Sequence, residues 1–191
     1  MQDVNVVVVF CGDESAERLA QAAAVGAVQG RANIRLRRLA ETDPRQAQPQ
    51  DYIAPRSADA EWADAIIACM PVQTDSLARE GPIAAHDATV QSPGRQPQSR
   101  LRFAGDYCFA GDYLGAAVFE QYFDSLKTLR EAGKLKCNVG GLIASEDEAA
   151  LRQAMESAGL TLVPATPDPR SLTGARLLGR SVADSARALR G

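Results

Sequence analysis

Within the first thirty residues, a continuous apolar segment is followed by a segment in which apolar residues recur at helical spacing. Residues 4–10 are almost unbroken apolar and largely β-branched, which is typical of a strand buried on both faces. The polar turn at residues 11–15 follows, and a helix is predicted from about 16 to 28. Its apolar stripe consists of Leu19, Ala22, Ala23, Gly26 and Ala27. A buried strand, a short turn and a helix form the first half of a βαβ unit, the unit from which parallel sheets are built.

The same alternation continues to the end of the chain. Further strands are predicted at residues 33–39, 65–70, 136–143 and 160–163, and further helices at 114–132, 146–158 and 171–189. Residues 41–58 are interpreted as a loop, and 61–64 as a helical turn. Right-handed crossovers leave few topologies for such a chain. We therefore predict an α/β three-layer sandwich with a five-stranded parallel sheet, and among the remaining strand orders we favour 2-1-3-4-5. The residues predicted to be buried in it are Val6, Val8, Ile66, Ile67, Val139 and Leu142.

Residues 72–113 interrupt this alternation. They contain three prolines and many glutamines, and they show no sustained period. A loop of that length within a compact domain is most often a functional segment or a disordered one. The chain is therefore interpreted as a single domain over residues 1–191, with a long insertion at about 72–113.

Composition and charge narrow the class of protein. The chain has 191 residues, 46% of them hydrophobic and 24% charged, which is enough for one globular domain with a sizeable core. A net charge of −3 argues against nucleic acid or an anionic membrane as the main partner. No apolar stretch is long enough to span a bilayer. The first residues lack the basic region and cleavage site of a signal peptide, so we expect a cytoplasmic protein.

Neither a metal site nor a catalytic set can be assigned. The chain has four cysteines and one histidine, without paired metal-ligand spacing, so we expect reduced thiols and no metal. Cys11 and Cys69 are predicted at the carboxyl ends of neighbouring strands. A reactive thiol at Cys11 is one hypothesis. The favoured one is that these cysteines are small, partly buried residues that fill strand ends. The arginines of the second strand, Arg35, Arg37 and Arg38, are interpreted as a solvated face.

Several segments together resemble flavodoxins, and more closely the tryptophan-repressor-binding-protein-like NAD(P)H:quinone reductases. They are residues 6–10 (VVVVF), 17–20 (ERLA), 25–27 (VGA), 34–39 (IRLRRL), 63–67 with Pro71, 134–145 and 159–164. The resemblance covers most of the chain outside 72–113. It implies the flavodoxin fold, FMN as cofactor and NAD(P)H:quinone oxidoreductase activity.

The FMN phosphate turn that the resemblance implies has changed residue types. In the family this turn reads Ser-x-Thr/Tyr-Gly-x-Thr/Ile, and its N–H and hydroxyl groups hold the phosphate at a helix N-terminus. Here Asp13 replaces the Thr or Tyr and Glu14 replaces the glycine. Each carboxylate close to a phosphate dianion would cost on the order of a few kcal/mol at an effective dielectric constant of about 20. The alternative interpretation is that both acids lie in the first turn of the helix, where the macrodipole favours them. The six positions of the turn are Cys11, Gly12, Asp13, Glu14, Ser15 and Ala16.

The other two flavin loops have changed as well. Pro71, Val72 and Gln73 begin the second loop, which lacks the family's aromatic residue and glycine, and Ser145 begins a third loop with few hydroxyls. Two hypotheses stay open. The chain is an FMN-dependent NAD(P)H:quinone oxidoreductase in which the insertion completes the site, or it is a non-flavin binding or interaction module that uses residues 72–113 as its contact surface. The partner is equally open: a small molecule, another protein, or a second copy of the chain in a homo-oligomer.

Overall fold

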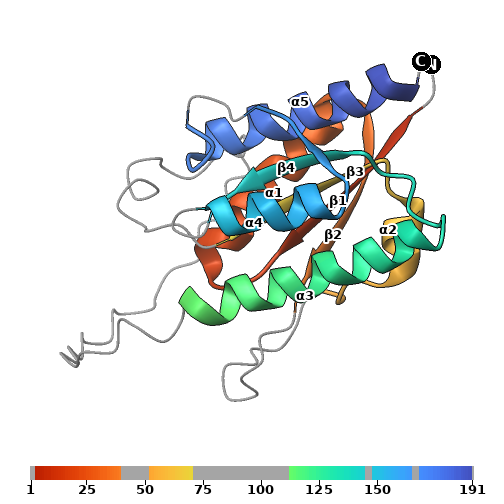
Figure 1. Cartoon of the computed structure of the whole chain (residues 1–191). Helices are drawn as coiled ribbons and strands as arrows, with labels where there is room; N and C mark the ends of the chain where they lie inside the picture. The colour runs from red at the N-terminus through yellow and green to blue at the C-terminus, as the bar shows by residue number, and fades with distance from the viewer. Residues whose placement is uncertain (1–2, 40–51, 71–111, 145–147, 165–167, 191) are drawn as a thin grey trace, which may run out of the picture.

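A computed structural model describes residues 3–39, 52–70, 112–144, 148–164 and 168–190. Its centre is a five-stranded, all-parallel sheet in the order β2-β1-β3-β4-β5, which confirms the predicted fold class and strand order (Figure 1). The strands are β1 (Val4–Phe10), β2 (Ala32–Arg38), β3 (Ala65–Cys69), β4 (Val139–Ile143) and β5 (Thr161–Leu162).

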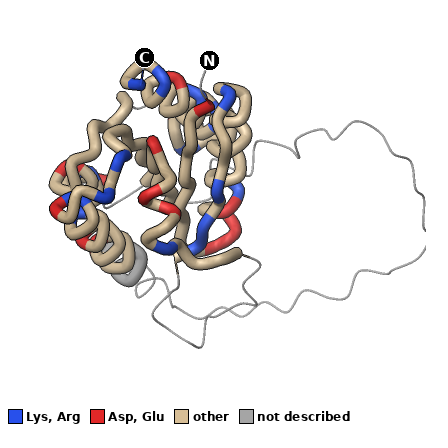
Figure 2. Tube along the Cα trace, turned by 90° about the vertical axis from the view of Figure 1, so that its right-hand side faces the viewer, with Lys and Arg blue, Asp and Glu red and all other residues tan. Residues whose placement is uncertain are grey.

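Helices cover both faces of the sheet. On one face lie α1 (Glu14–Gln29) and α5 (Leu172–Arg190), and on the other α2 (Ser57–Trp62), α3 (Asp112–Glu131) and α4 (Glu148–Ser157) (Figure 1). The two ends of the described chain lie side by side, where Arg190 donates a hydrogen bond to the backbone oxygen of Asp3. Acidic and basic residues are interspersed along the helices and strands in the view of Figure 2.

The sheet divides the core into two clusters. On β1, Val6 and Val8 face α1 and α5, whereas Val7 and Val9 face α2, α3 and α4. This is the period-two alternation of a strand that is covered on both sides. The six residues predicted to be buried are all buried: Val6, Val8, Ile66, Ile67, Val139 and Leu142.

Two glycines bring α1 and α5 into backbone contact. A Cβ atom on Gly179 would lie 1.9 Å from the carbonyl oxygen of Ala23, and one on Gly26 would lie 1.8 Å from that of Arg176. No side chain fits at such distances. The pair of helices packs at the closest approach that the backbone allows, and this fixes the position of α1 on the sheet.

Several elements differ from their predicted bounds. Helix α1 begins at Glu14, so the last two residues of the predicted turn are helical. Helix α2 occupies Ser57–Trp62, partly inside the predicted loop. Helix α3 begins at Asp112, so the last two residues of the predicted insertion belong to it; the rest of that insertion lies outside the described residues.

The strands near the carboxyl end of the chain are shorter than predicted. Strand β4 begins at Val139 rather than at residue 136. The neighbouring strands β3 and β5 begin at Ala65 and Thr161, and both of these residues pair with Val139, so residues 136–138 lie beyond the start of both neighbouring strands. Strand β5 is limited to Thr161–Leu162. No helix in the described part of the chain has the length and apolar character needed to cross a membrane.

Candidate functional site

The turn after β1 is the candidate site, because ligands of open parallel sheets bind beyond the carboxyl ends of the strands. Two neighbouring strands hold this turn. The backbone nitrogen of Cys11 donates to the carbonyl oxygen of Cys69 at 3.4 Å, and Nη2 of Arg38 donates to the carbonyl oxygen of Gly12 at 2.9 Å. Gly12 has a φ of 100°, a conformation that favours glycine. The chain thereby turns sharply from β1 into α1.

Asp13 is the N-cap of α1. Its Oδ1 accepts hydrogen bonds from the backbone nitrogens of Ser15 at 2.9 Å and Ala16 at 3.2 Å, and also from the hydroxyl of Ser15. Its backbone is extended, with φ −84° and ψ −174°. These N–H groups begin the helix and have no partner within it. The chain's own carboxylate therefore occupies the donors that a helix N-terminus offers to an anion.

This geometry decides whether the turn fits the FMN phosphate. A phosphate bound there would have to displace the Asp13 carboxylate from the N–H groups of Ser15 and Ala16. It would also lie close to Glu14, which is exposed in the first turn of the helix. The hydroxyl of Ser15 is already used by Asp13, and Ala16 has none. The residues present at this turn do not fit a phosphate group.

An aromatic and acidic cluster adjoins the turn. The rings of Phe10 and Tyr52 meet edge to face with centroids 5.0 Å apart, and the hydroxyl of Tyr52 donates to Oε1 of Glu17 at 2.8 Å. The guanidinium of Arg38 lies 6.0 Å from the Phe10 ring. The side of the turn that faces β2 is thus occupied by side chains of the protein itself.

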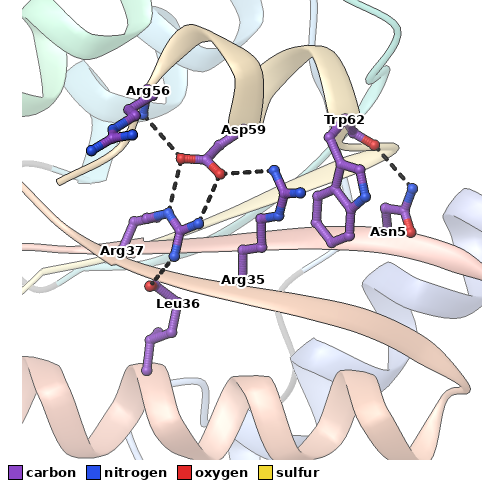
Figure 3. A network of polar contacts seen from close by, with 7 residues as sticks. All are labelled: Asn5, Arg35, Leu36, Arg37, Arg56, Asp59 and Trp62. Atoms are coloured by element: carbon purple, nitrogen blue, oxygen red, sulfur yellow. Dashed lines mark hydrogen bonds and ion pairs between the residues drawn. The ribbon is translucent and has the colours of Figure 1, made fainter. Parts of the chain in front are cut away.

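The arginines of β2 correct one prediction. Arg35 and Arg37 are not a solvated face, because both bind Asp59 of α2, which is 4% exposed (Figure 3). Arg37 is bidentate, with Nε 2.8 Å from Oδ2 and Nη2 2.9 Å from Oδ1, and Nη1 of Arg35 is 3.0 Å from Oδ1. Arg38 is not solvated either, since it is half-buried and bonds Gly12. The reason is that α2 covers this edge of the sheet.

Further contacts fix Asp59 in place. The backbone nitrogen of Arg56 donates to its Oδ2 at 3.0 Å, and the guanidinium of Arg35 lies 4.1 Å from the centroid of the Trp62 ring (Figure 3). Burial alone would raise the pKa of Asp59. The hydrogen bonds from Arg37, Arg56 and Arg35 outweigh burial and hold that pKa below its ordinary value. The carboxylate is therefore charged and anchors α2 to β2.

The described thiols are buried more deeply than the partly buried residues that we expected at strand ends. Cys11, Cys69 and Cys137 are all buried, and Cys11 and Cys69 belong to the clusters on opposite faces of the sheet. Burial raises the pKa of the Cys69 thiol, and it raises that of Cys137 to about 12. Cys108 lies outside the described residues. Thiols of this kind are present almost wholly in the protonated form at neutral pH.

The remaining predicted site residues cannot be placed. Pro71, Val72, Gln73 and Ser145 lie outside the described residues, so the second and third flavin loops stay predictions. In the parts of the chain that the structure describes, no group of three or more His, Cys, Asp or Glu side chains could hold a metal ion.

Comparison with known proteins identifies the fold. No protein-family model and no curated protein matches the sequence. Among solved structures, a flavodoxin from Streptococcus pneumonia TIGR4 aligns with 95% of this chain and 99% of its own, at 10% identity and a TM-score of 0.51. The fold is flavodoxin-like. A diflavin flavoprotein A3 from Nostoc sp. aligns with 100% of this chain and 97% of its own, at 12% identity and a TM-score of 0.50. The closer resemblance to the tryptophan-repressor-binding-protein-like reductases stays a prediction.

In this flavodoxin-like fold, Asp13 and Asp59 have structural roles that the sequence did not reveal. Asp13 was interpreted as part of a phosphate loop, although aspartate is among the preferred N-cap residues and could have marked a helix start at Glu14. Asp59 received no role. The signal for it was the spacing of Arg35 and Arg37, which places two cations on one face of a strand and calls for a buried acid opposite them.

Proposed function

We propose that this chain is a non-flavin binding module built on a flavodoxin-like fold. One observation carries the proposal: the Asp13 carboxylate accepts from the backbone nitrogens of Ser15 and Ala16, where a flavin phosphate would need donors. A helix N-terminus that is already neutralised by an internal carboxylate has no remaining attraction for a dianion.

The charge balance of the turn supports the same proposal. Asp13 and Glu14 bring two negative charges to the start of α1, and Glu17 adds a third within the first turn. Arg38, which contacts the turn, is engaged with the carbonyl oxygen of Gly12. An incoming phosphate would meet net repulsion, which at an effective dielectric constant of about 20 is on the order of a few kcal/mol per close carboxylate.

A second candidate is an FMN-dependent NAD(P)H:quinone oxidoreductase. It is favoured by the flavodoxin-like fold itself, in which the turn after β1 lies at the carboxyl edge of the sheet. If FMN were bound, it would supply hydride and electron transfer. The residues of the first turn do not fit its phosphate, which is the observation against this candidate.

A titration with FMN separates the two candidates. The purified protein is expected to be colourless, and added FMN is expected to keep its full fluorescence in the presence of excess protein. Flavin absorbance in the purified protein, or stoichiometric quenching of FMN on titration, would contradict the proposal and favour the reductase.

A further inference from the structure

Strand β2 forms one edge of the sheet, because it stands first in the order β2-β1-β3-β4-β5. On its inner side it pairs with β1, and the backbone nitrogen of Leu39, just beyond β2, donates to the carbonyl oxygen of Phe10 at 2.8 Å. Arg38 is turned the other way, since its backbone nitrogen donates to the carbonyl oxygen of Ile53 at 3.3 Å. Successive residues of a strand direct their backbone groups to opposite sides. Every second residue back from Arg38 therefore directs its N–H and C=O groups away from the sheet.

Ala32, Ile34 and Leu36 are these outward-pointing residues of β2. The carbonyl oxygen of Leu36 accepts a hydrogen bond from Nη1 of Arg37 at 3.1 Å (Figure 3). Within the described residues, the N–H groups of all three and the carbonyl oxygens of Ala32 and Ile34 have no partner on this side. Helix α2 lies over one face of β2 and does not pair with this edge. An open strand edge of this kind is a template for another strand.

Exposed apolar side chains gather beside this edge. Three of the five large apolar side chains that are exposed in the described part of the chain are Val25 (44%), Val28 (58%) and Ile53 (58%). Ile53 adjoins the edge through its bond to β2. Val25 and Val28 share one face of α1 with Gln21, whose Nε2 donates to the hydroxyl of Tyr52 at 2.9 Å. Because Tyr52 precedes Ile53, this face of α1 is turned toward the same edge.

The charges around the edge allow a second copy to approach. Helix α1 and the turn after it carry no charged residue between Arg18 and Arg31, although the exposed face of a surface helix is usually charged. On the other face of β2, the charges of Arg35 and Arg37 are balanced by Asp59. Two copies that meet along β2 therefore bring no unbalanced like charges together on the face that α1 covers.

We propose that a second copy of this chain pairs antiparallel with β2 over residues 32–36, so that the two sheets become one. The two-fold axis passes at Ile34, which lies opposite Ile34 of the partner subunit. Leu36 then lies opposite Ala32 of the partner subunit, so that a large side chain meets a small one. Each facing pair exchanges both of its N–H···O bonds. The side chains of these residues pack on the face that α1 covers, where Val25 and Val28 of both copies close the join.

This register is self-complementary, and for that reason the residues select a second copy as the occupant of the edge. On the face that α2 covers, Arg35 lies opposite Asn33 of the partner subunit, a donor opposite an amide oxygen. Arg37 lies near the partner's Arg31, and Asp59 keeps its charge balanced. The proposed interface is separate from the turn after β1, so it goes beyond the function proposed above and does not depend on it.

The oligomeric state of the full chain tests the interface. Sedimentation equilibrium at micromolar to millimolar concentrations is expected to show a dimer. Ile34→Pro removes an outward N–H that pairing with β1 does not use, so it should leave the fold intact and give a monomer. Val25→Glu places a charge from each copy at the join and should weaken the dimer by at least about tenfold. Leu177→Glu is the matched control, because it puts the same charge on an exposed apolar position of α5, and it should leave the dimer unchanged.

Cross-linking tests the register. In a chain that also carries Cys108→Ser, Ile34→Cys should give a disulfide-linked dimer under mild oxidation, because facing Cα atoms of such a pair lie about 5.5 Å apart. Leu36→Cys is the control on the same strand and the same face. Its two copies lie about 13 Å apart along the join, too far for a disulfide. Non-reducing electrophoresis measures both variants.

A monomer at every concentration would overturn the proposal. A dimer that Val25→Glu and Ile34→Pro leave unchanged would overturn it as well, because it would form through another surface. Circular dichroism and melting temperature show whether each variant is folded. If Ile34→Pro is not folded, Val25→Glu with its control Leu177→Glu decides.

Discussion

The Asp13 carboxylate lies 2.9 Å from the backbone nitrogen of Ser15 and caps α1 with the oxygen that also reaches Ala16. One side chain thus has two consequences. It stabilises the helix that packs against α5, and in the function proposed above it also excludes a phosphate from the start of that helix. Substitutions at Asp13 are therefore expected to affect both stability and flavin affinity.

The first prediction concerns the cap. Replacement Asp13→Ala removes the acceptor of two backbone N–H groups and should lower the free energy of unfolding by about 0.5–2 kcal/mol. Urea unfolding at neutral pH measures this change. Replacement Glu14→Ala, at the neighbouring exposed position, is the control and should change stability by no more than about 0.5 kcal/mol. Equal changes in the free energy of unfolding for the two replacements would show that the hydrogen bonds of the Asp13 cap do not stabilise the protein.

The second prediction concerns the contact between α1 and α5. Replacement Gly179→Ala places a Cβ atom 1.9 Å from the carbonyl oxygen of Ala23, so the helices must separate. The expected loss in the free energy of unfolding is about 1–3 kcal/mol. Gly133→Ala has no atom within 4 Å of the new Cβ and a φ of 69°, so only conformational strain applies, about 1–2 kcal/mol. If a thermal melt finds Gly179→Ala as stable as the natural sequence, α1 and α5 do not approach each other this closely.

The third prediction uses pH to test the Asp59 network. Asp59→Asn should lower the free energy of unfolding by about 1–3 kcal/mol at pH 7, because two arginines lose a charged partner. The pKa of Asp59 in the folded protein lies below its ordinary value of 3.8. Its contribution is therefore complete above that value and is lost as the pH falls through the folded-state pKa.

The measurement for this network is denaturant unfolding of both proteins from pH 7 down to pH 2.5. The difference in stability should stay constant to about pH 4.5 and shrink below it. Glu61→Gln, an exposed change on the same helix, controls for the loss of one surface charge. A difference that grows toward acid would mean that folding raises the pKa of Asp59 instead of lowering it.

The fourth prediction concerns the thiols. In the native protein at neutral pH, Cys11 should be alkylated no faster than a cysteine in a model peptide, and Cys69 and Cys137 should react only after denaturation. All three are buried, and burial raises the pKa of Cys69 and of Cys137. Mass spectrometry of timed alkylation measures each site. Rapid labelling confined to Cys11 would instead make thiol-based redox chemistry the leading hypothesis.

The sheet could be predicted from sequence because its signals are local. The unbroken apolar run of β1, the stripe of α1 and their repetition allow few arrangements. Right-handed crossovers reduce the possible strand orders to a few, of which 2-1-3-4-5 is the favoured one. Element ends were predicted less well. β4 begins where Ala65 and Thr161 become available as partners, and pairing of this kind is not encoded in the residues of β4 alone.

The site could be predicted only in part, because its decisive contacts join distant segments. Asp59 lies 22 residues beyond Arg37 in the chain, between the loop predicted at 41–58 and the helical turn predicted at 61–64. Tyr122 lies in the predicted helix 114–132, and the sequence does not distinguish it from the helix's apolar residues. Only the structure shows that its buried hydroxyl has no hydrogen-bond partner among the described residues.

The ratio of FMN to riboflavin affinity measures whether Asp13 keeps a phosphate away from the start of α1. The two flavins differ only in the phosphate. The unaltered protein should bind FMN no more tightly than riboflavin, whereas the double variant Asp13→Thr, Glu14→Gly should gain FMN affinity over riboflavin by at least about tenfold. FMN binding by the unaltered chain that is much tighter than riboflavin binding would show that Asp13 does not exclude the phosphate.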